Sequence, residues 1–141
     1  MKDYPYIKVI TAFALAPFVV AFAFMATWFL YGALTQTDPL ASADFDMFMI
    51  YCVAIPGMME VIYGLPAAIL GSACVYWQAQ RTAPHIFKAA LGGIAAMLIT
   101  NLIYGIDYHD AESMMYFIVG DVVGLGAIVP TLIGLSLFPK E

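Results

Sequence analysis

The feature that most constrains this chain is an uncharged apolar stretch that runs from residue 9 to residue 34. A helix needs about 20 apolar residues to cross the hydrocarbon core of a bilayer, and this stretch is longer. We therefore expect it to tilt in the membrane or to bend at Pro17. A cleaved signal peptide has a shorter apolar region, of roughly 7 to 15 residues, so a retained span is the favoured interpretation.

Three further stretches are apolar enough to cross a bilayer, over residues 47–77, 89–106 and 113–138. The whole chain agrees with this: 64% of its residues are hydrophobic, 11% are charged, and the mean hydropathy is +0.91. Soluble domains are near half apolar and a quarter charged. The prediction is an all-α, polytopic membrane protein, with residues 1–141 forming a single domain of four transmembrane helices.

The charged residues predict the orientation of these spans. All five basic residues fall on one side, because Lys2 and Lys8 precede the first span, Arg81 and Lys88 separate the second from the third, and Lys140 follows the fourth. Basic residues favour the cytoplasmic side. We therefore expect both termini to be cytoplasmic, in a membrane of the bacterial inner type. The opposite loops hold only acidic charges, at Asp38, Asp44, Asp46, Asp107, Asp110 and Glu112.

Regularly spaced glycines predict the packing faces of two spans. Gly57, Gly64 and Gly71 recur every seven residues in the second span, and Gly120 and Gly124 belong to a small-residue stripe in the fourth. Small residues let membrane helices approach closely. We therefore expect these five glycines to lie at helix crossings.

Glu60 is the most unusual residue within a predicted span. Counted from residue 47, it lies about 20 Å along the helix, close to the membrane midplane. A charge at that depth is costly unless it is neutralised, paired or hydrated, and no Lys, Arg or His lies in any predicted span. We expect the protonated form as the default. Both a structural and a functional interpretation of Glu60 remain open.

In the structural interpretation, Glu60 hydrogen-bonds to backbone freed by Pro56, or to Asn101 or Tyr104. In the functional one, Glu60 binds a proton, a cation or a partner's base, with Tyr63 nearby, because ionisable residues inside a membrane are functional candidates. Asp121 fits either role, and Asn101 is more typical of a contact between helices.

Catalysis and cofactor binding are not favoured by the sequence. No serine has a predicted histidine partner, and the intramembrane carboxyls lack an accompanying cation or ligand cluster. The Met-Met pairs at 58–59 and 114–115 offer thioether sulfur, a ligand that Cu(I) prefers. Methionine is also a flexible core filler, and that interpretation is favoured. His85 and His109 fall on opposite sides, which excludes a bis-histidine haem within the bundle. We expect no metal, no cofactor and no enzymatic activity.

Two functions remain as hypotheses. The first is a small non-enzymatic membrane protein that contacts another membrane protein, as an accessory subunit or an immunity-type protector. The second is a small homo-oligomeric proton- or cation-coupled transporter or channel that uses Glu60 and Asp121. The expected partners are therefore the lipid bilayer and either another membrane protein or further copies of the chain. Nucleic acid is excluded, since five basic residues against ten acidic ones cannot neutralise a run of phosphates.

Overall fold

The computed structural model describes residues 4–35, 45–104, 114, 115 and 117–140. Within this part of the chain every regular element is a helix. Four helical segments there are long and apolar enough to cross a membrane: Tyr6–Gly32, Ile50–Tyr76, Ala83–Tyr104 and Ile118–Leu137. The expected all-helical class and the four candidate spans are therefore confirmed.

The first candidate span is one helix, and the second is built from three consecutive segments. Helix α1 covers Tyr6–Thr35 and contains Pro17. The second comprises α2 (Phe45–Met49), the π-helix η2 (Ile50–Ala54) and α3 (Ile55–Tyr76). The last π-type bond runs from the Ile55 N–H to the Ile50 carbonyl, five residues back. Pro56 has no N–H to continue that pattern, so the change to α-helix falls at a proline.

The fourth candidate span repeats this construction. The π-helix η3 (Phe117–Ile128) passes into α6 (Val129–Leu137), whose second residue is Pro130. The third span, α4 (Ala83–Tyr104), begins earlier than the predicted residue 89. Pro84 suits the first turn of a helix, where its missing N–H has no intrahelical partner to lose. The prediction began only where the charged residues end, whereas the helix extends beyond the apolar stretch.

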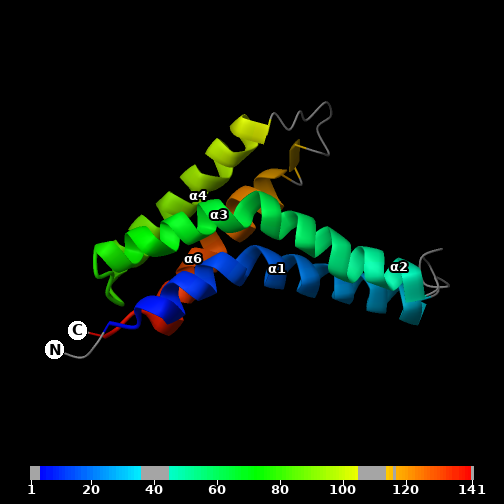
Figure 1. Cartoon of the computed structure of the whole chain (residues 1–141), viewed down its shortest axis with the longest axis horizontal. Coiled ribbons are helices and arrows are strands. Elements are labelled where there is room, and N and C mark those ends of the chain that lie inside the picture. Colours follow the sequence, from blue (N-terminus) through cyan, green and yellow to red (C-terminus); the bar gives the residue numbers. More distant parts are fainter. Residues whose placement is uncertain (1–3, 36–44, 105–113, 116, 141) are drawn as a thin grey trace.

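The helices form two hairpins that meet at one end and separate at the other (Figure 1). The first hairpin is α1 with α2, η2 and α3, and the second is α4 with η3 and α6. The start of α1 and the end of α6 lie at the closed end. We call residues 6–18, 63–76, 83–101 and 125–137 the closed half, and residues 19–35, 45–62, 102–104 and 117–124 the open half. Apart from its neighbours in the chain, η2 contacts α1, and η3 contacts α4 more than α1.

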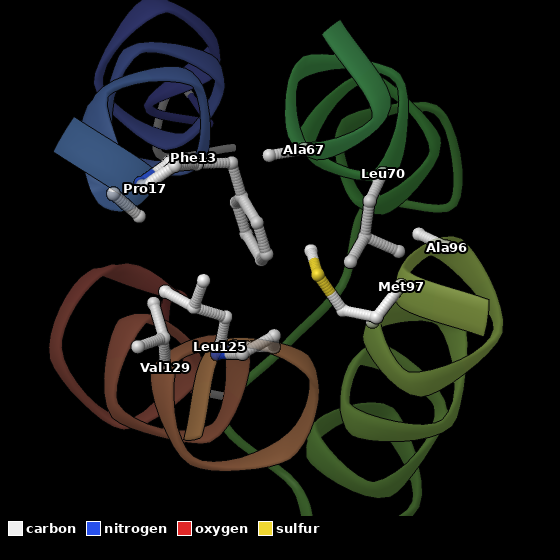
Figure 2. Close-up of a pocket in the computed structure, with 11 residues that line it drawn as sticks. Phe13, Pro17, Ala67, Leu70, Ala96, Met97, Leu125 and Val129 are labelled. Carbon is white, nitrogen blue, oxygen red and sulfur yellow. The ribbon is translucent and has the colours of Figure 1, made fainter. Parts of the chain in front are cut away.

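The core lies in the closed half, where all four spans contribute side chains. Val9, Phe13, Leu70, Cys74 and Phe138 are among its buried members. Figure 2 shows the side chains of Phe13 and Met97 pointing into the centre between the four helices. The cavity left there measures about 20 Å³, which is room for about one water molecule. The centre of the closed half is therefore filled by side chains, and a larger, more open space of about 410 Å³ lies between α1 and α6.

Candidate functional site

Glu60 contacts the backbone of α1 beside a proline. Its Oε2 accepts a hydrogen bond of 3.1 Å from the backbone N–H of Phe18, in a half-buried position between α3 and α1. Phe18 directly follows Pro17, whose ring crowds the carbonyl four residues earlier and bends a helix. An acidic side chain of one helix thus satisfies an amide at the bend of its neighbour.

The partner of Glu60 differs from the sequence prediction. Backbone freed by Pro56, Asn101 and Tyr104 were the expected partners, whereas the donor is the Phe18 amide. Pro56 lies one turn away on the same helix as Glu60, while Pro17 lies on the helix that α3 packs against. The sequence predicts a hydrogen bond from backbone near a proline, but it points to Pro56 and not to Pro17. The sequence does not show which residues of two packed helices lie at the same depth.

Gly64 makes space for the Glu60 carboxyl. A Cβ atom on Gly64 would lie 2.7 Å from Glu60 Oε1 and 3.0 Å from Glu60 Cδ. Any larger residue at 64 must therefore push the carboxyl aside. We expected Gly64 to allow the close approach of another helix, but the nearest atoms belong to its own helix.

The other predicted glycines fall into two groups. Gly71 lies at a true helix crossing, because a Cβ there would be 2.9 Å from Phe13 Cβ and 3.2 Å from Ile10 Cα. By contrast, nothing among the described residues comes within 4 Å of a Cβ added at Gly57 or Gly120, and Gly124 meets only a carbonyl of its own helix at 3.4 Å. In the described part of the chain, these last three glycines are therefore not at helix crossings.

The close crossing in the second hairpin joins Gly93 to Gly126, and neither is among the five glycines predicted above. A Cβ on Gly93 would clash with the carbonyl oxygen of Gly126 and lie 2.8 Å from Pro130 Cγ. A Cβ on Gly126 would in turn be 3.1 Å from Ile94 Cα. The prediction chose Gly120 and Gly124 by α-helical spacing, but this segment is a π-helix, whose wider turn presents a different face.

The structure describes the positions of three of the remaining predicted site residues. Tyr63 is buried on α3, and Asn101 is buried on α4, where its Nδ2 donates to the Met97 carbonyl at 2.9 Å. Tyr104 is 55% exposed. Asp121 belongs to η3, but its side chain lies outside the described part.

The acidic loop residues are mostly outside the described residues as well. Asp46 is exposed in the first turn of α2, where a carboxylate complements the helix dipole. The other five, for which the prediction stays a prediction, are Asp38, Asp44, Asp107, Asp110 and Glu112.

At the closed end, polar groups join the end of the fourth span to the loop between the hairpins. The Arg81 backbone N–H donates to the Pro139 carbonyl at 2.8 Å, and Arg81 Nη2 donates to the Ser136 carbonyl at 3.0 Å. These bonds fasten the loop to the end of α6. Burial, with a smaller contribution from nearby Cys74, raises the pKa of Tyr4 to about 12, so its phenol stays neutral at physiological pH.

Comparison with known proteins identifies no relative of this chain. The chain matches no family model, no curated protein and no solved structure.

Proposed function

We propose that this chain is a small non-enzymatic integral membrane protein that acts through helix–helix contacts with another membrane protein, as an accessory subunit or an immunity-type protector. In this proposal it resides in a bacterial-type inner membrane with both termini cytoplasmic. The observation that supports it most is the separation of the two hairpins in the open half (Figure 1), which leaves helix faces without a neighbour among the described residues.

Two glycines in the open half are suited to an approaching helix. Gly57 and Gly120 have no atom of the described residues within 4 Å of an added Cβ. Small residues are enriched where membrane helices meet, because they allow backbones to approach. Positions that are small yet unoccupied within one chain are therefore available to a helix of a partner.

The second hypothesis, a homo-oligomeric proton- or cation-coupled transporter, is favoured by one observation. Glu60 offers a carboxyl inside a candidate span, and Phe18 engages only its Oε2. The centre between the four helices holds a cavity of only about 20 Å³, so this hypothesis places the pathway between copies. The partner-binding hypothesis is preferred because it needs no such additional assembly.

Site-specific photocrosslinking in intact cells tests the proposal. A photoreactive residue at Met58 probes the open half, and one at Phe87 is a matched control in the closed half, since these side chains are 64% and 63% exposed. We expect Met58 to give a single heavier adduct with a different membrane protein, identified by mass spectrometry, and Phe87 to give none. A dimer of the chain itself from Met58 would instead support the transporter, and no protein adduct from Met58 would contradict both.

The orientation has its own test. In a variant with both native cysteines replaced, a cysteine at Ser42 should react with an impermeant thiol reagent added to intact cells, whereas one at Gln80 should react only after lysis. Labelling at Gln80 in intact cells would contradict cytoplasmic termini.

A further inference from the structure

We propose that the contact between Glu60 and the Phe18 amide is a hinge lock, which fixes the bend of α1 at Pro17 and so sets how far the first hairpin stands from the second in the open half. This inference concerns the shape of the chain and does not depend on the identity of a partner. It goes beyond the proposed function by assigning Glu60 a conformational task.

The bend in α1 leaves an amide that needs an acceptor. Pro17 lacks an N–H, and its ring crowds the Phe13 carbonyl four residues earlier, so the helical bonding is interrupted at this turn. In a bilayer there is no water to satisfy a displaced amide. The next N–H, that of Phe18, is satisfied by Glu60 Oε2 at 3.1 Å. The bent conformation is therefore stabilised by an acceptor from the neighbouring helix.

The second step concerns the position of the acceptor. Because Gly64 has no Cβ, the Glu60 carboxyl can lie against this part of α3, where even an alanine would come within 2.7 Å of Oε1. Glu60 and Gly64 thus act as a pair. One supplies the oxygen atom, and the other supplies the space that lets it reach α1.

The third step concerns what moves with the bend. Figure 1 shows α1 and the second span changing direction together between the closed and the open half. Near their far ends, Phe29 and Phe48 pack edge to face with ring centroids 5.4 Å apart and planes at 76°. In the open half, α1 and the second span therefore contact each other both near Phe18 and near Phe29. We expect the open half of the first hairpin to move as one rigid unit, which we call the arm.

The size of the movement follows from helix geometry. About 17 residues separate Phe18 from Thr35, which corresponds to about 25 Å of helix. A change of about 20° in a kink would displace the end of such an arm by about 9 Å. A shift of that size is measurable between two spin labels.

The experiment uses the full chain in lipid nanodiscs, with Cys52 and Cys74 replaced by Ala and spin labels at positions 30 and 103. Leu30 and Ile103 are 59% and 75% exposed on α1 and α4. Pulsed electron resonance then gives the distance between the arm and the second hairpin. A second pair of labels, at Ile7 and Leu91, lies in the closed half and reports whether the fold is intact.

The expected results distinguish an oxygen acceptor from a charge. Glu60→Gln retains an oxygen for the Phe18 amide and should leave the distance between positions 30 and 103 unchanged. Glu60→Ala removes the acceptor and should shift or broaden this distance by about 6 Å, because position 30 lies about 18 Å along the arm from Phe18, with the closed-half distance unchanged. Gly64→Ala, which pushes the carboxyl away, should act in the same direction as Glu60→Ala.

Pro17→Ala tests whether the effect of Glu60 depends on the proline. Pro17→Ala removes the ring that bends α1, so the Phe18 N–H can donate to the Ala14 carbonyl four residues earlier, and adding Glu60→Ala to it should cause no further shift. The proposal is overturned if Glu60→Ala leaves the arm distance unchanged, if Gln acts like Ala, or if Glu60→Ala has its full effect in the Pro17→Ala background. A changed closed-half distance in Glu60→Ala would mean that this variant does not keep the fold. The comparison of Gly64→Ala with Glu60→Gln then tests the proposal, which requires an arm shift in the first variant and none in the second.

Discussion

The two hairpins each contain a proline close to a helix crossing, and they accommodate it in different ways. In the first, the amide that follows Pro17 is satisfied by a side chain, Glu60. In the second, Pro130 has no N–H for the Gly126 carbonyl four residues earlier, and that carbonyl faces Gly93 of α4. One crossing therefore depends on a polar side chain that can move, and the other on backbone contact that leaves no room for any side chain.

This difference predicts unequal tolerance to substitution. Backbone atoms cannot rotate out of the way, so the Gly93 crossing should be the more sensitive. The flexible Glu60 side chain can be displaced, so substitutions beside Glu60 should change the shape of the first hairpin before they unfold it.

The largest effect is expected from Gly93→Leu. Even a Cβ at this position clashes with the Gly126 carbonyl and crowds Pro130, so α4 and η3 must separate. We expect the free energy of unfolding to fall by about 3 kcal/mol or more, measured by circular dichroism during titration with sodium dodecyl sulfate. An equal stability for this variant and the parent would remove the distinction between the hairpins.

A smaller loss is expected from Gly64→Leu. The new side chain displaces the Glu60 carboxyl and leaves the Phe18 amide unsatisfied, which should cost about 1 to 3 kcal/mol in the same titration. Combining it with Glu60→Ala tests the cause, because the two substitutions remove the same contact and their losses should not add. Additive losses would instead show that Gly64 matters for packing between helices.

Glu60→Gln separates stability from function. Gln keeps the shape and the acceptor oxygen, and it removes a charge that is costly in the membrane, so the melting temperature in detergent should equal or exceed that of the parent. If Glu60 pairs with a base of the partner, crosslinking from Met58 should fall by about tenfold or more, because the partner's buried charge is left uncompensated. A stable variant with unchanged crosslinking would reduce Glu60 to a structural role.

The smallest effect on the single chain is expected from Gly57→Ala. Nothing among the described residues lies within 4 Å of the added methyl group, and Ala is the better helix former by up to about 1 kcal/mol. Stability should be unchanged or slightly higher. Crosslinking from Met58 nevertheless should weaken if a partner helix approaches here, and an unaltered crosslink would argue that Gly57 faces lipid.

Which features the sequence predicts depends on how local their causes are. The four apolar stretches and the unusual acid at 60 can be recognised from residues that are close together in the chain. The role of each glycine cannot, because Gly57, Gly64 and Gly71 share one spacing but face open space, the carboxyl of Glu60 and the backbone of α1, respectively. Gly126 was not predicted at its crossing with Gly93, because a π-helix changes the face that α-helical spacing predicts.

The sequence by itself determined the helical class and the candidate spans, because burying backbone in lipid requires long apolar helices whatever their neighbours. It also singled out Glu60, since an uncompensated acid in such a stretch is unusual. The tertiary structure alone decided which amide Glu60 meets, which glycines lie at crossings and where the hairpins separate. These depend on the relative height, rotation and bending of helices that are distant in sequence, and two atoms form a hydrogen bond only when all three bring them within about 3 Å.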